Sequence, residues 1–246
     1  MQHFGIIGFP LEHSFSANYF NRKFAEEHID AEYRLYPLDD IRQFPCLCET
    51  HDFTGLNVTL PYKEQVIPYL DELDDTARKI GAVNVIRFRN GRLRGYNTDA
   101  LGFMESFATA DNPPADTSRQ ALVLGTGGAA KAVHYGLRRL GIEPHYVSRR
   151  AGTDYTYADL TQEVVNRHCV VVNCTPLGMY PAVEAYAPFP FEWLTSRHLV
   201  YDVIYNPEQT LFLQQATARG ARTMNGIGML YGQARAAWQI WSETDA

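Results

Sequence analysis

The sequence predicts an α/β protein built from two domains. Segments with the patterns of strands and helices alternate along most of the chain, and a glycine-rich turn at Gly125 separates one such strand from a helix. With 246 residues, of which 46% are hydrophobic, the chain is long enough to form two cores of ordinary size. We therefore expect an amino-terminal α/β domain and a second domain that is doubly wound and of the Rossmann type.

The composition excludes several classes of partner. A net charge of -6 and a pI of about 5.7 do not suit a protein whose main partner is nucleic acid or an anionic membrane. No segment approaches the roughly 18 apolar residues of a membrane helix, and no signal peptide is recognisable. The 4 Cys and 8 His form neither a disulfide framework nor a metal-ligand pattern. We expect a cytoplasmic protein without a metal.

The first hundred residues alternate between short strands and helices. Strands are expected at 4–8, 33–36, 55–60, 82–88 and 93–96, and helices at 15–28, 38–49, 63–70 and 74–79. Ser14 and Ser16 are suitable capping residues for the first helix, and Pro61 ends the third strand or places it on an edge. Asn90-Gly91 is a signal for a tight hairpin turn. This alternation predicts the α/β domain.

The rest of the chain has the pattern of repeated βαβ units. A connecting helix is expected at 99–110 and a surface loop at 111–118, followed by strands at 121–124, 145–148, 170–173 and 200–204 and an amphipathic helix at 129–140. Such repeats favour a mostly parallel sheet covered by helices on both faces. We expect the last helix, 229–241, to pack back on the first domain. The first domain then comprises 1–100 with 229–246, and the second 101–228.

The glycine-rich turn has the sequence of a dinucleotide-binding fingerprint. Gly125-Thr126-Gly127-Gly128-Ala129, followed by another Ala, matches G-x-G-x-x-G/A between a strand and a helix. Glycine lets the backbone approach a pyrophosphate, whose charge is favoured by the amides at a helix amino terminus. The alternative is an ordinary glycine-rich turn between a strand and a helix.

The end of the next strand favours NADP over NAD. An NAD site usually carries an acidic residue about 20 positions after the first glycine. Here the chain reads Ser148-Arg149-Arg150 instead. A guanidinium can bind a ribose 2′-phosphate through two charge-assisted hydrogen bonds, whereas a carboxylate would repel it. A solvated basic turn is the alternative.

Two polar clusters in the first domain point to a ligand rich in hydroxyl groups. The segment from Asn57 through Thr59 to Lys63 sets an amide, a hydroxyl and an amine around a short extended stretch. A second cluster contains Asn97 and Asp99. Amides and hydroxyls bind ring hydroxyls directionally, and an amine can transfer a proton. With the dinucleotide fingerprint, these clusters indicate a dehydrogenase.

The ordered motifs of this chain resemble those of the shikimate dehydrogenase family over nearly its whole length. They are His13-Ser-Phe-Ser16, Asn57-Val-Thr-Leu-Pro-Tyr-Lys63, Gly81-Ala-Val-Asn84, Asn97-Thr-Asp99, the fingerprint at Gly125, Asn173-Cys-Thr-Pro-Leu-Gly-Met179 and Gly226-Ile-Gly-Met-Leu-Tyr-Gly-Gln233. The resemblance implies NADPH-linked, reversible reduction of 3-dehydroshikimate to shikimate, a step of chorismate and aromatic amino-acid biosynthesis.

The same resemblance implies roles for the polar residues. Ser14 and Ser16 would bind the carboxylate of the substrate, although capping the helix is an alternative role for both. Lys63 would act as general acid and base, and Asp99 would orient it. A solvated lysine and a helix-capping aspartate are the corresponding alternatives.

Further contacts are implied around the substrate and the cofactor. Ring hydroxyls or the catalytic pair would be held by Asn57, Thr59, Asn84 and Asn97, the ligand would also meet Tyr205 and Gln233, and the nicotinamide would lie near Thr175, Gly228 and Met229. Turn formation is the alternative for Asn57, Thr59, Asn84 and Asn97. Ordinary packing or hydrogen bonding is the alternative for Tyr205 and Gln233, and packing is the alternative for Met229.

The chain departs from the family pattern at three positions. Ala17 stands where Pro is usual, Phe20 where His is common, and Asn225 where many relatives have Asp. The first two put ligand affinity in question and leave the reacting groups intact. Oxidation of quinate with NAD and non-catalytic sensing of a dinucleotide or cyclic acid are the competing functions. We expect a small-molecule substrate and either a monomer or a homodimer.

Overall fold

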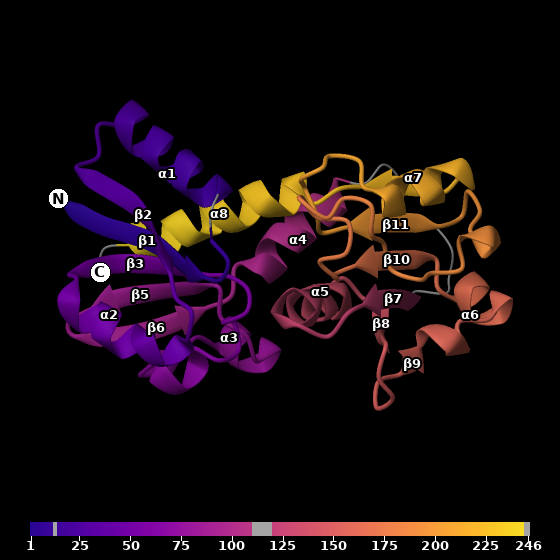
Figure 1. Cartoon of the computed structure of the whole chain (residues 1–246), viewed down its shortest axis with the longest axis horizontal. Coiled ribbons are helices and arrows are strands. Elements are labelled where there is room, and N and C mark those ends of the chain that lie inside the picture. The colour runs from indigo at the N-terminus through magenta and orange to yellow at the C-terminus, as the bar shows by residue number, and fades with distance from the viewer. Residues whose placement is uncertain (12–13, 110–119, 244–246) are drawn as a thin grey trace. The chain divides into compact units, whose positions relative to one another are not determined.

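A computed structural model describes residues 1–11, 14–109 and 120–243. The chain divides into two compact units (Figure 1). The first comprises Met1–Thr98 with Ala234–Ala246, and the second comprises Asp99–Gln233. The chain therefore returns to the first unit inside its last helix, α8 (Ile227–Ser242). His13 and the loop expected at 111–118 lie outside the described residues.

The first unit contains a mixed sheet in the order β2-β1-β3-β5-β6-β4. Its strands are β1 (Gln2–Gly8), β2 (Ala31–Pro37), β3 (Phe53–Val58), β4 (Glu72–Leu73), β5 (Val85–Arg89) and β6 (Arg92–Tyr96). β1 is parallel to β2 and β3, whereas β5 is antiparallel to β3 and β6. The predicted hairpin between β5 and β6 is confirmed, because Asn90 and Gly91 have φ angles of 51° and 71°.

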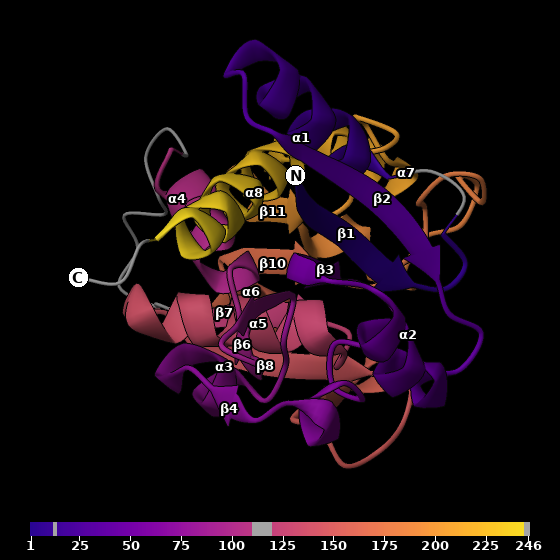
Figure 2. The ribbon, with the colours of Figure 1, turned by 90° about the vertical axis from the view of Figure 1, so that its left-hand side faces the viewer.

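Helices cover both faces of this sheet. On one face, α1 (Phe15–Glu26) and the end of α8 pack on β1 and β2 (Figure 2). On the other face lie α2 (Phe44–Thr50), α3 (Asp75–Ile80) and the short 3-10 helix Ile41–Gln43. Trp241 of α8 donates from its indole Nε1 to the carbonyl of Ile86 at 3.0 Å and fills the space above Gly55. The end of α8 is thus part of the first core.

The helix expected at 63–70 is wrong, and the one expected at 38–49 is only partly right. Residues 63–66 form turns, followed by a 3-10 helix at Ile67–Tyr69. Pro68 explains this, because it lacks an N–H donor and disfavours helical geometry in the residue before it. The second segment begins as a 3-10 turn capped by Asp40 and becomes helical only at Phe44, next to a proline at the first turn.

The second unit is the doubly wound domain predicted from the sequence. Its strands are β7 (Gln120–Leu124), β8 (Glu143–Ser148), β9 (Tyr155–Thr156), β10 (Val170–Asn173), β11 (Leu199–Asp202) and β12 (Arg222–Met224). They are all parallel, in the order β12-β11-β10-β7-β8-β9. This is the Rossmann order, with its switch point between β7 and β10. β9 and β12 were not predicted.

Helices lie on both sides of the second sheet (Figure 1). One side carries α4 (Asp99–Ala108), α5 (Gly128–Arg139) and the first turns of α8, and the other carries α6 (Gln162–Arg167) and α7 (Leu211–Ala218). The sequence analysis located α4, α5 and α8 but not α6 or α7. Within the described residues, no helix is both long and apolar enough to cross a bilayer.

Candidate active site

The polar residues of the first unit gather where neighbouring strands begin and end. Asn57 lies near the carboxyl end of β3 and is paired in register with Val85 of β5, next to Asn84. Asn97 directly follows β6, the other neighbour of β5. The three amides are 4%, 3% and 3% exposed, so each must find hydrogen-bond partners within the protein. Thr59 follows β3 and is partly buried.

A buried hydrogen-bond network fixes the orientation of these amides. Tyr33 donates from its hydroxyl to Oδ1 of Asn57 at 2.6 Å, and Nδ2 of Asn57 donates to the carbonyl of Asn84 at 3.2 Å. The side chain of Asn84 donates to Oγ1 of Thr98 at 2.9 Å and accepts from the Thr98 amide at 2.7 Å. Asn97 donates to the carbonyl of Ala82 at 2.9 Å. Tyr33 and Thr98 were not among the predicted site residues.

The two serines begin α1, as the sequence analysis expected. Ser14 is the N-cap residue, and its hydroxyl oxygen accepts from the Ser16 amide at 3.2 Å. Ser16 is buried, with 7% of its surface exposed. Burial raises the pKa of Tyr33 well above its ordinary value, so the phenol stays protonated. The capping role of Ser14 is therefore present in the structure, and its oxygen lies at a helix amino terminus that favours anions.

The two candidate catalytic residues belong to different units, Lys63 to the first and Asp99 to the second. Lys63 follows β3 in a turn whose backbone is anchored, because its carbonyl accepts from the Val83 amide at 2.7 Å. The neighbouring Tyr62 is buried and donates to the carbonyl of Leu38 at 2.5 Å. Asp99 is the first residue of α4 and is 5% exposed. In the sequence it directly follows Thr98, which belongs to the amide network.

The glycine-rich turn of the second unit is shaped to receive an anion. Gly125 has a φ of +105°, a conformation that requires glycine, and its amide donates to the carbonyl of Val147 at 2.9 Å. Gly127 is the N-cap of α5, and a Cβ added there would meet nothing within 4 Å. The chain's own packing therefore does not require glycine at this position. Open space beside the amino terminus of a 12-residue helix suits a pyrophosphate.

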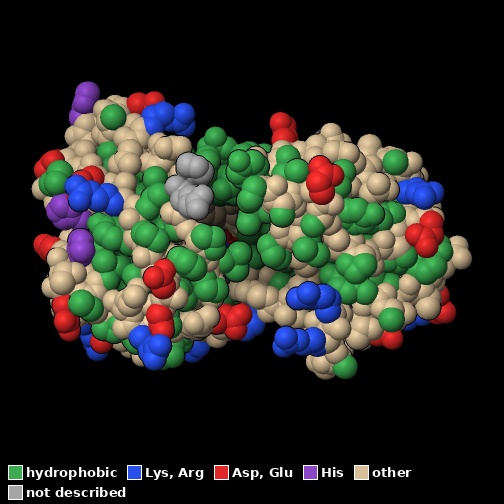
Figure 3. All heavy atoms as spheres, in the orientation of Figure 1, with side chains coloured by type: hydrophobic (Ala, Val, Ile, Leu, Met, Phe, Trp, Pro, Cys, Tyr) green, Lys and Arg blue, Asp and Glu red, His purple; other side chains and the backbone are tan. Residues whose placement is uncertain are grey.

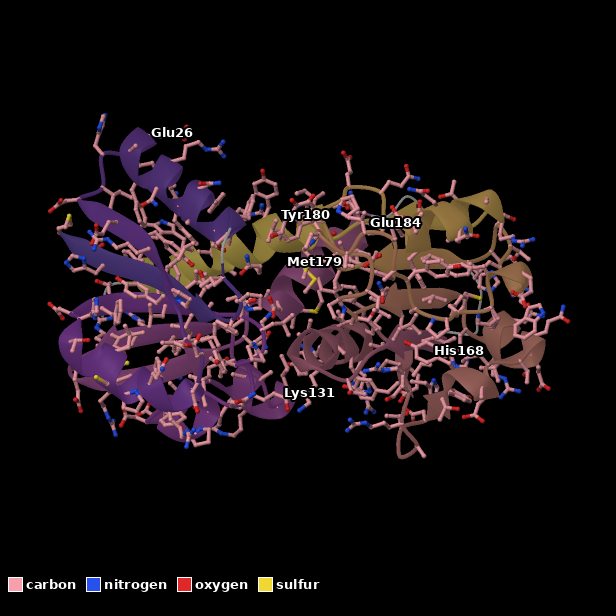
Figure 4. The ribbon with its side chains drawn as sticks, in the orientation of Figure 1. Glu26, Lys131, His168, Met179, Tyr180 and Glu184 are labelled. Atoms are coloured by element: carbon pink, nitrogen blue, oxygen red, sulfur yellow. The ribbon has the colours of Figure 1, made fainter. Side chains whose placement is uncertain are left out.

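Basic side chains lie near the same edge of the sheet. Arg149 and Arg150 follow the last residue of β8, and both are exposed. The Arg150 amide donates to Oγ of Ser148 at 3.2 Å, which shapes the turn. Figure 3 shows basic side chains on the lower surface of this unit, and Figure 4 labels Lys131 in the first turn of α5. These positive charges suit a phosphorylated dinucleotide.

A buried polar cluster supports Thr175 at the carboxyl ends of β10 and β11. Oδ1 of Asn173 accepts from the amide and the hydroxyl of Thr175 at 3.1 and 2.7 Å, and Nδ2 donates to Asp202 at 3.1 Å. Asp202 also accepts from the hydroxyl of Thr210 at 2.7 Å and the amide of Ile204 at 3.1 Å. Burial nevertheless raises the pKa of Asp202 to about 6. Sequence reasoning missed Asp202, although a polar residue ends each of two neighbouring hydrophobic strands.

The remaining predicted contacts also have roles in packing. Met229 is 7% exposed and belongs to the core around Phe103, and a Cβ on Gly228 would lie 2.5 Å from Oγ of Ser106. Gln233 is largely buried and donates to the carbonyl of Leu230 at 2.9 Å. Tyr205 is 37% exposed in the segment after β11. The exposed Met179 and Tyr180 follow β10, at the opposite sheet edge from His168 (Figure 4).

The described residues contain no group of three or more His, Cys, Asp or Glu side chains placed to hold a metal ion. The second unit offers an open glycine-rich turn that can bind an anion, and the first unit offers a set of oriented amides and hydroxyls. The turn suits a dinucleotide, and the amides and hydroxyls suit a small polyhydroxylated acid.

Comparisons with known proteins agree with this description. A family model described as the shikimate dehydrogenase substrate binding domain matches residues 6–86, which lie in the first unit. A protein of Desulforamulus reducens named shikimate dehydrogenase (NADP(+)) is 38% identical over 262 residues, which cover 97% of this chain and 89% of the relative.

Solved structures show the same fold over the whole chain. Shikimate dehydrogenase from Thermus thermophilus, in complex with NADP(H) and shikimate, is 30% identical with a TM-score of 0.86, covering 98% of this chain and 94% of the other. Quinate dehydrogenase from Corynebacterium glutamicum, in complex with NAD, is 28% identical with a TM-score of 0.84, covering 98% and 93%. The fold alone therefore does not separate the two substrates or the two cofactors.

Proposed function

The chain belongs to the shikimate dehydrogenase family, and from this premise we propose that it catalyses the NADPH-dependent, reversible reduction of 3-dehydroshikimate to shikimate. The observation that carries the proposal is the buried amide network at the ends of β3, β5 and β6. It holds amide groups in fixed orientations, as recognition of a ring with several hydroxyls requires. The reaction belongs to chorismate and aromatic amino-acid biosynthesis.

The first unit would bind both ends of the cyclic acid, its carboxylate and its ring hydroxyls. Ser14 and Ser16 would receive the carboxylate at the amino terminus of α1, where the helix dipole adds to the hydrogen bonds. The ring hydroxyls would be oriented by Asn57, Thr59, Asn84 and Asn97, and Tyr205 and Gln233 would complete the contacts. Neutral donors satisfy the anion without the desolvation of a second full charge.

The residues present fit a bound NADP(H), which would supply the hydride. Gly125, Thr126, Gly127, Gly128 and Ala129 would receive its pyrophosphate, because the turn is open above the start of α5. The 2′-phosphate would be bound by Arg149 and Arg150 beside Ser148. Thr175, Gly228 and Met229 would lie near the nicotinamide.

Lys63 would serve as the general acid in the reductive direction. As the carbonyl oxygen of the substrate gains negative charge, the Lys63 ammonium would stabilise that charge and donate a proton to it. The neutral amine would then recover a proton from water, and in the oxidative direction it would act as the base. Asp99 would orient the amine by charge attraction. The short turn after β3 supports this role, because its anchored backbone limits where the lysine can reach.

The proposal is tested by following NADPH oxidation with 3-dehydroshikimate, and by initial rates with each pairing of shikimate or quinate with NADP or NAD. We expect the highest kcat/KM with shikimate and NADP. A higher kcat/KM with quinate and NAD would show the competing enzyme. Ligand binding without turnover of any acid would show a sensor. We also propose that the protein acts in the cytoplasm, as a monomer or a homodimer. Light scattering of the purified protein would distinguish the two oligomeric states.

Replacement of Lys63 by Ala tests the proposed mechanism. Loss of a general acid should reduce kcat by about 10² to 10⁴. Lys79, an exposed lysine on α3, provides a matched control, because its replacement by Ala removes the same charge from the same unit. Lys79→Ala should retain the kcat of the parent protein. An unchanged kcat in Lys63→Ala would remove Lys63 from the mechanism.

A further inference from the structure

We propose that Asn173 is a positioning residue for the nicotinamide end of the cofactor, because it holds Thr175 beside the glycine-rich turn. The inference rests on the proposed function and extends it to a buried side chain that would not touch the cofactor itself. Asn173 is the last residue of β10 and is fully buried. β10 and β7 flank the switch point of the sheet, where a Rossmann domain binds its dinucleotide.

Thr175 lies against the first glycine of the turn. A Cβ added to Gly125 would lie 3.5 Å from Cγ2 of Thr175 and 3.4 Å from the carbonyl carbon of Cys174. Thr175 is only partly buried, and it lies outside any helix or strand, between β10 and the exposed residues 176–177. Regular secondary structure therefore does not fix the position of Thr175, and its side-chain and backbone hydrogen bonds have to do so.

Asn173 supplies two of the hydrogen bonds of Thr175. Oδ1 of Asn173 accepts from the Thr175 amide at 3.1 Å and from the Thr175 hydroxyl at 2.7 Å. Nδ2 of Asn173 donates to Oδ1 of Asp202 at 3.1 Å, and the same carboxyl group accepts from the hydroxyl of Thr210 through Oδ2. Asn173, Asp202 and Thr210 are all fully buried, so water does not compete for the bonds between them.

Counting the hydrogens assigns a direction to each bond. The Thr175 amide can only donate, so it must face Oδ1 of Asn173, and the Nδ2 group is then turned to Asp202. Because Oδ1 can only accept, the Thr175 hydroxyl donates its single hydrogen to Asn173. Thr175 therefore has no side-chain hydrogen left for a ligand. Its side chain can meet the cofactor only through the oxygen lone pairs and the methyl group.

These bonds prepare one wall of the proposed cofactor site. With Asn173 in place, the side chain of Thr175 keeps one orientation beside Gly125 before any ligand arrives. Without the Asn173 amide, the Thr175 amide and hydroxyl would turn to water, and the segment after β10 would take several conformations. Binding would then carry the cost of ordering that segment. The adenosine end of the cofactor, assigned to Arg149 and Arg150 after β8, does not depend on Asn173.

Asn173→Ala tests the inference by isothermal titration calorimetry, which needs no turnover. We expect the Kd for NADP to rise about five- to tenfold, while the Kd for adenosine 2′,5′-bisphosphate, which lacks the nicotinamide end, should stay within about twofold of the parent value. Thr210→Val is the matched control, because it also removes a bond to Asp202 but leaves both bonds between Asn173 and Thr175. It should lower the melting temperature, as Asn173→Ala does, and keep the parent Kd for NADP.

The outcomes separate this inference from the proposed function. If the parent protein binds NADP but does not turn over shikimate, the proposed function fails, and the Kd values still decide the role of Asn173. If it turns over shikimate and Asn173→Ala has the parent Kd for NADP, only the inference fails. Equal losses of affinity for NADP and adenosine 2′,5′-bisphosphate, or a similar loss in Thr210→Val, would show general damage to the unit and would also overturn the inference. A parent protein that binds no NADP would overturn both.

Hydrogen exchange of the parent protein, followed residue by residue by NMR, does not depend on how any variant folds. The Thr175 amide should exchange slowly, like the amides of β10, although it lies in a partly exposed segment without regular secondary structure. Fast exchange at Thr175 would contradict its bond to Asn173 and would overturn the inference.

Discussion

Among single residues, Asp202 shows how burial and hydrogen bonding compete. Three donors favour its ionised form, yet the loss of hydration is larger, and the pKa of the carboxyl is raised to about 6. Asp202 holds Asn173, which in turn orients Thr175 at the edge of the sheet proposed to bind the cofactor. A change in the charge of Asp202 should therefore affect the orientation of Thr175, which is assigned to the nicotinamide site.

The raised pKa of Asp202 predicts how stability depends on pH. The folded protein retains this proton at a pH where the unfolded chain has lost it, so the contribution is present below pH 3.8 and is lost as the pH rises through about 6. Relative to Asp202→Asn, the free energy of unfolding should fall by about 2 kcal/mol between pH 4 and pH 7. Urea unfolding of the parent protein and of Asp202→Asn between pH 4 and pH 7 measures this difference in free energy. A constant difference would show that the carboxyl titrates normally.

At the scale of elements, two helices of the second unit approach each other through glycines. A Cβ on Gly102 of α4 would lie 2.5 Å from the carbonyl oxygen of Met229 and 2.6 Å from the amide of Gln233, both in α8. A Cβ on Gly232 would lie 2.8 Å from the α-carbon of Gly102. Backbone atoms cannot move aside as side-chain ends can, so any larger residue must separate the helices. The start of α8 carries several of the proposed ligand contacts, so this packing also fixes where they lie.

Replacement of Gly102 by Ala should therefore destabilise the protein by about 1–3 kcal/mol in urea unfolding. Gly127→Ala is the comparison, because a Cβ added at Gly127 would meet no atom within 4 Å. It should destabilise the free protein less than Gly102→Ala does, because no atom clashes with the added methyl and only a helix-capping preference is lost. It should also raise the KM for NADP, since the methyl would enter the space proposed for the pyrophosphate. Equal stability of the two variants would contradict the close approach of α4 and α8.

At the scale of the whole molecule, the carboxyl-terminal residues complete a core begun by the amino-terminal ones. Residues from Ala234 onward belong to the first unit, where Trp241 contacts the rings of Phe4 and Phe20 and lies against Gly55. The second unit is thus inserted between two parts of the first. The last residues of the chain should therefore matter for the stability of the unit that begins at Met1.

Trp241→Ala should destabilise the first unit by about 3–5 kcal/mol, the usual cost of removing a buried aromatic side chain. Native-state hydrogen exchange can follow the two units separately. The variant should lose protection in β1, β3 and β5 while β7 and β10 keep theirs, whereas Trp193→Ala, in the second unit, should affect β7 and β10. Equal loss of protection in both units would show that they unfold together.

Much of the fold was predictable because its signals are local. The hydrophobic strands 121–124 and 170–173, the Asn90-Gly91 turn and the glycine-rich turn at Gly125 depend on neighbouring residues only. The helix expected at 63–70 failed where Pro68 outweighed the apolar pattern. Helix α7 and strand β12 were missed because their sequences carry weak periodic signals.

The sequence by itself determined the class of fold, the glycine turn with its basic neighbours, and the family of the chain, since these depend on residue types in a fixed order. Only the tertiary structure decided that Tyr33 donates to Asn57, that Asn173 links Asp202 to Thr175, and that Trp241 completes the first core. The physical reason is that hydrogen-bond direction and burial depend on which distant segments meet. No local pattern encodes that meeting.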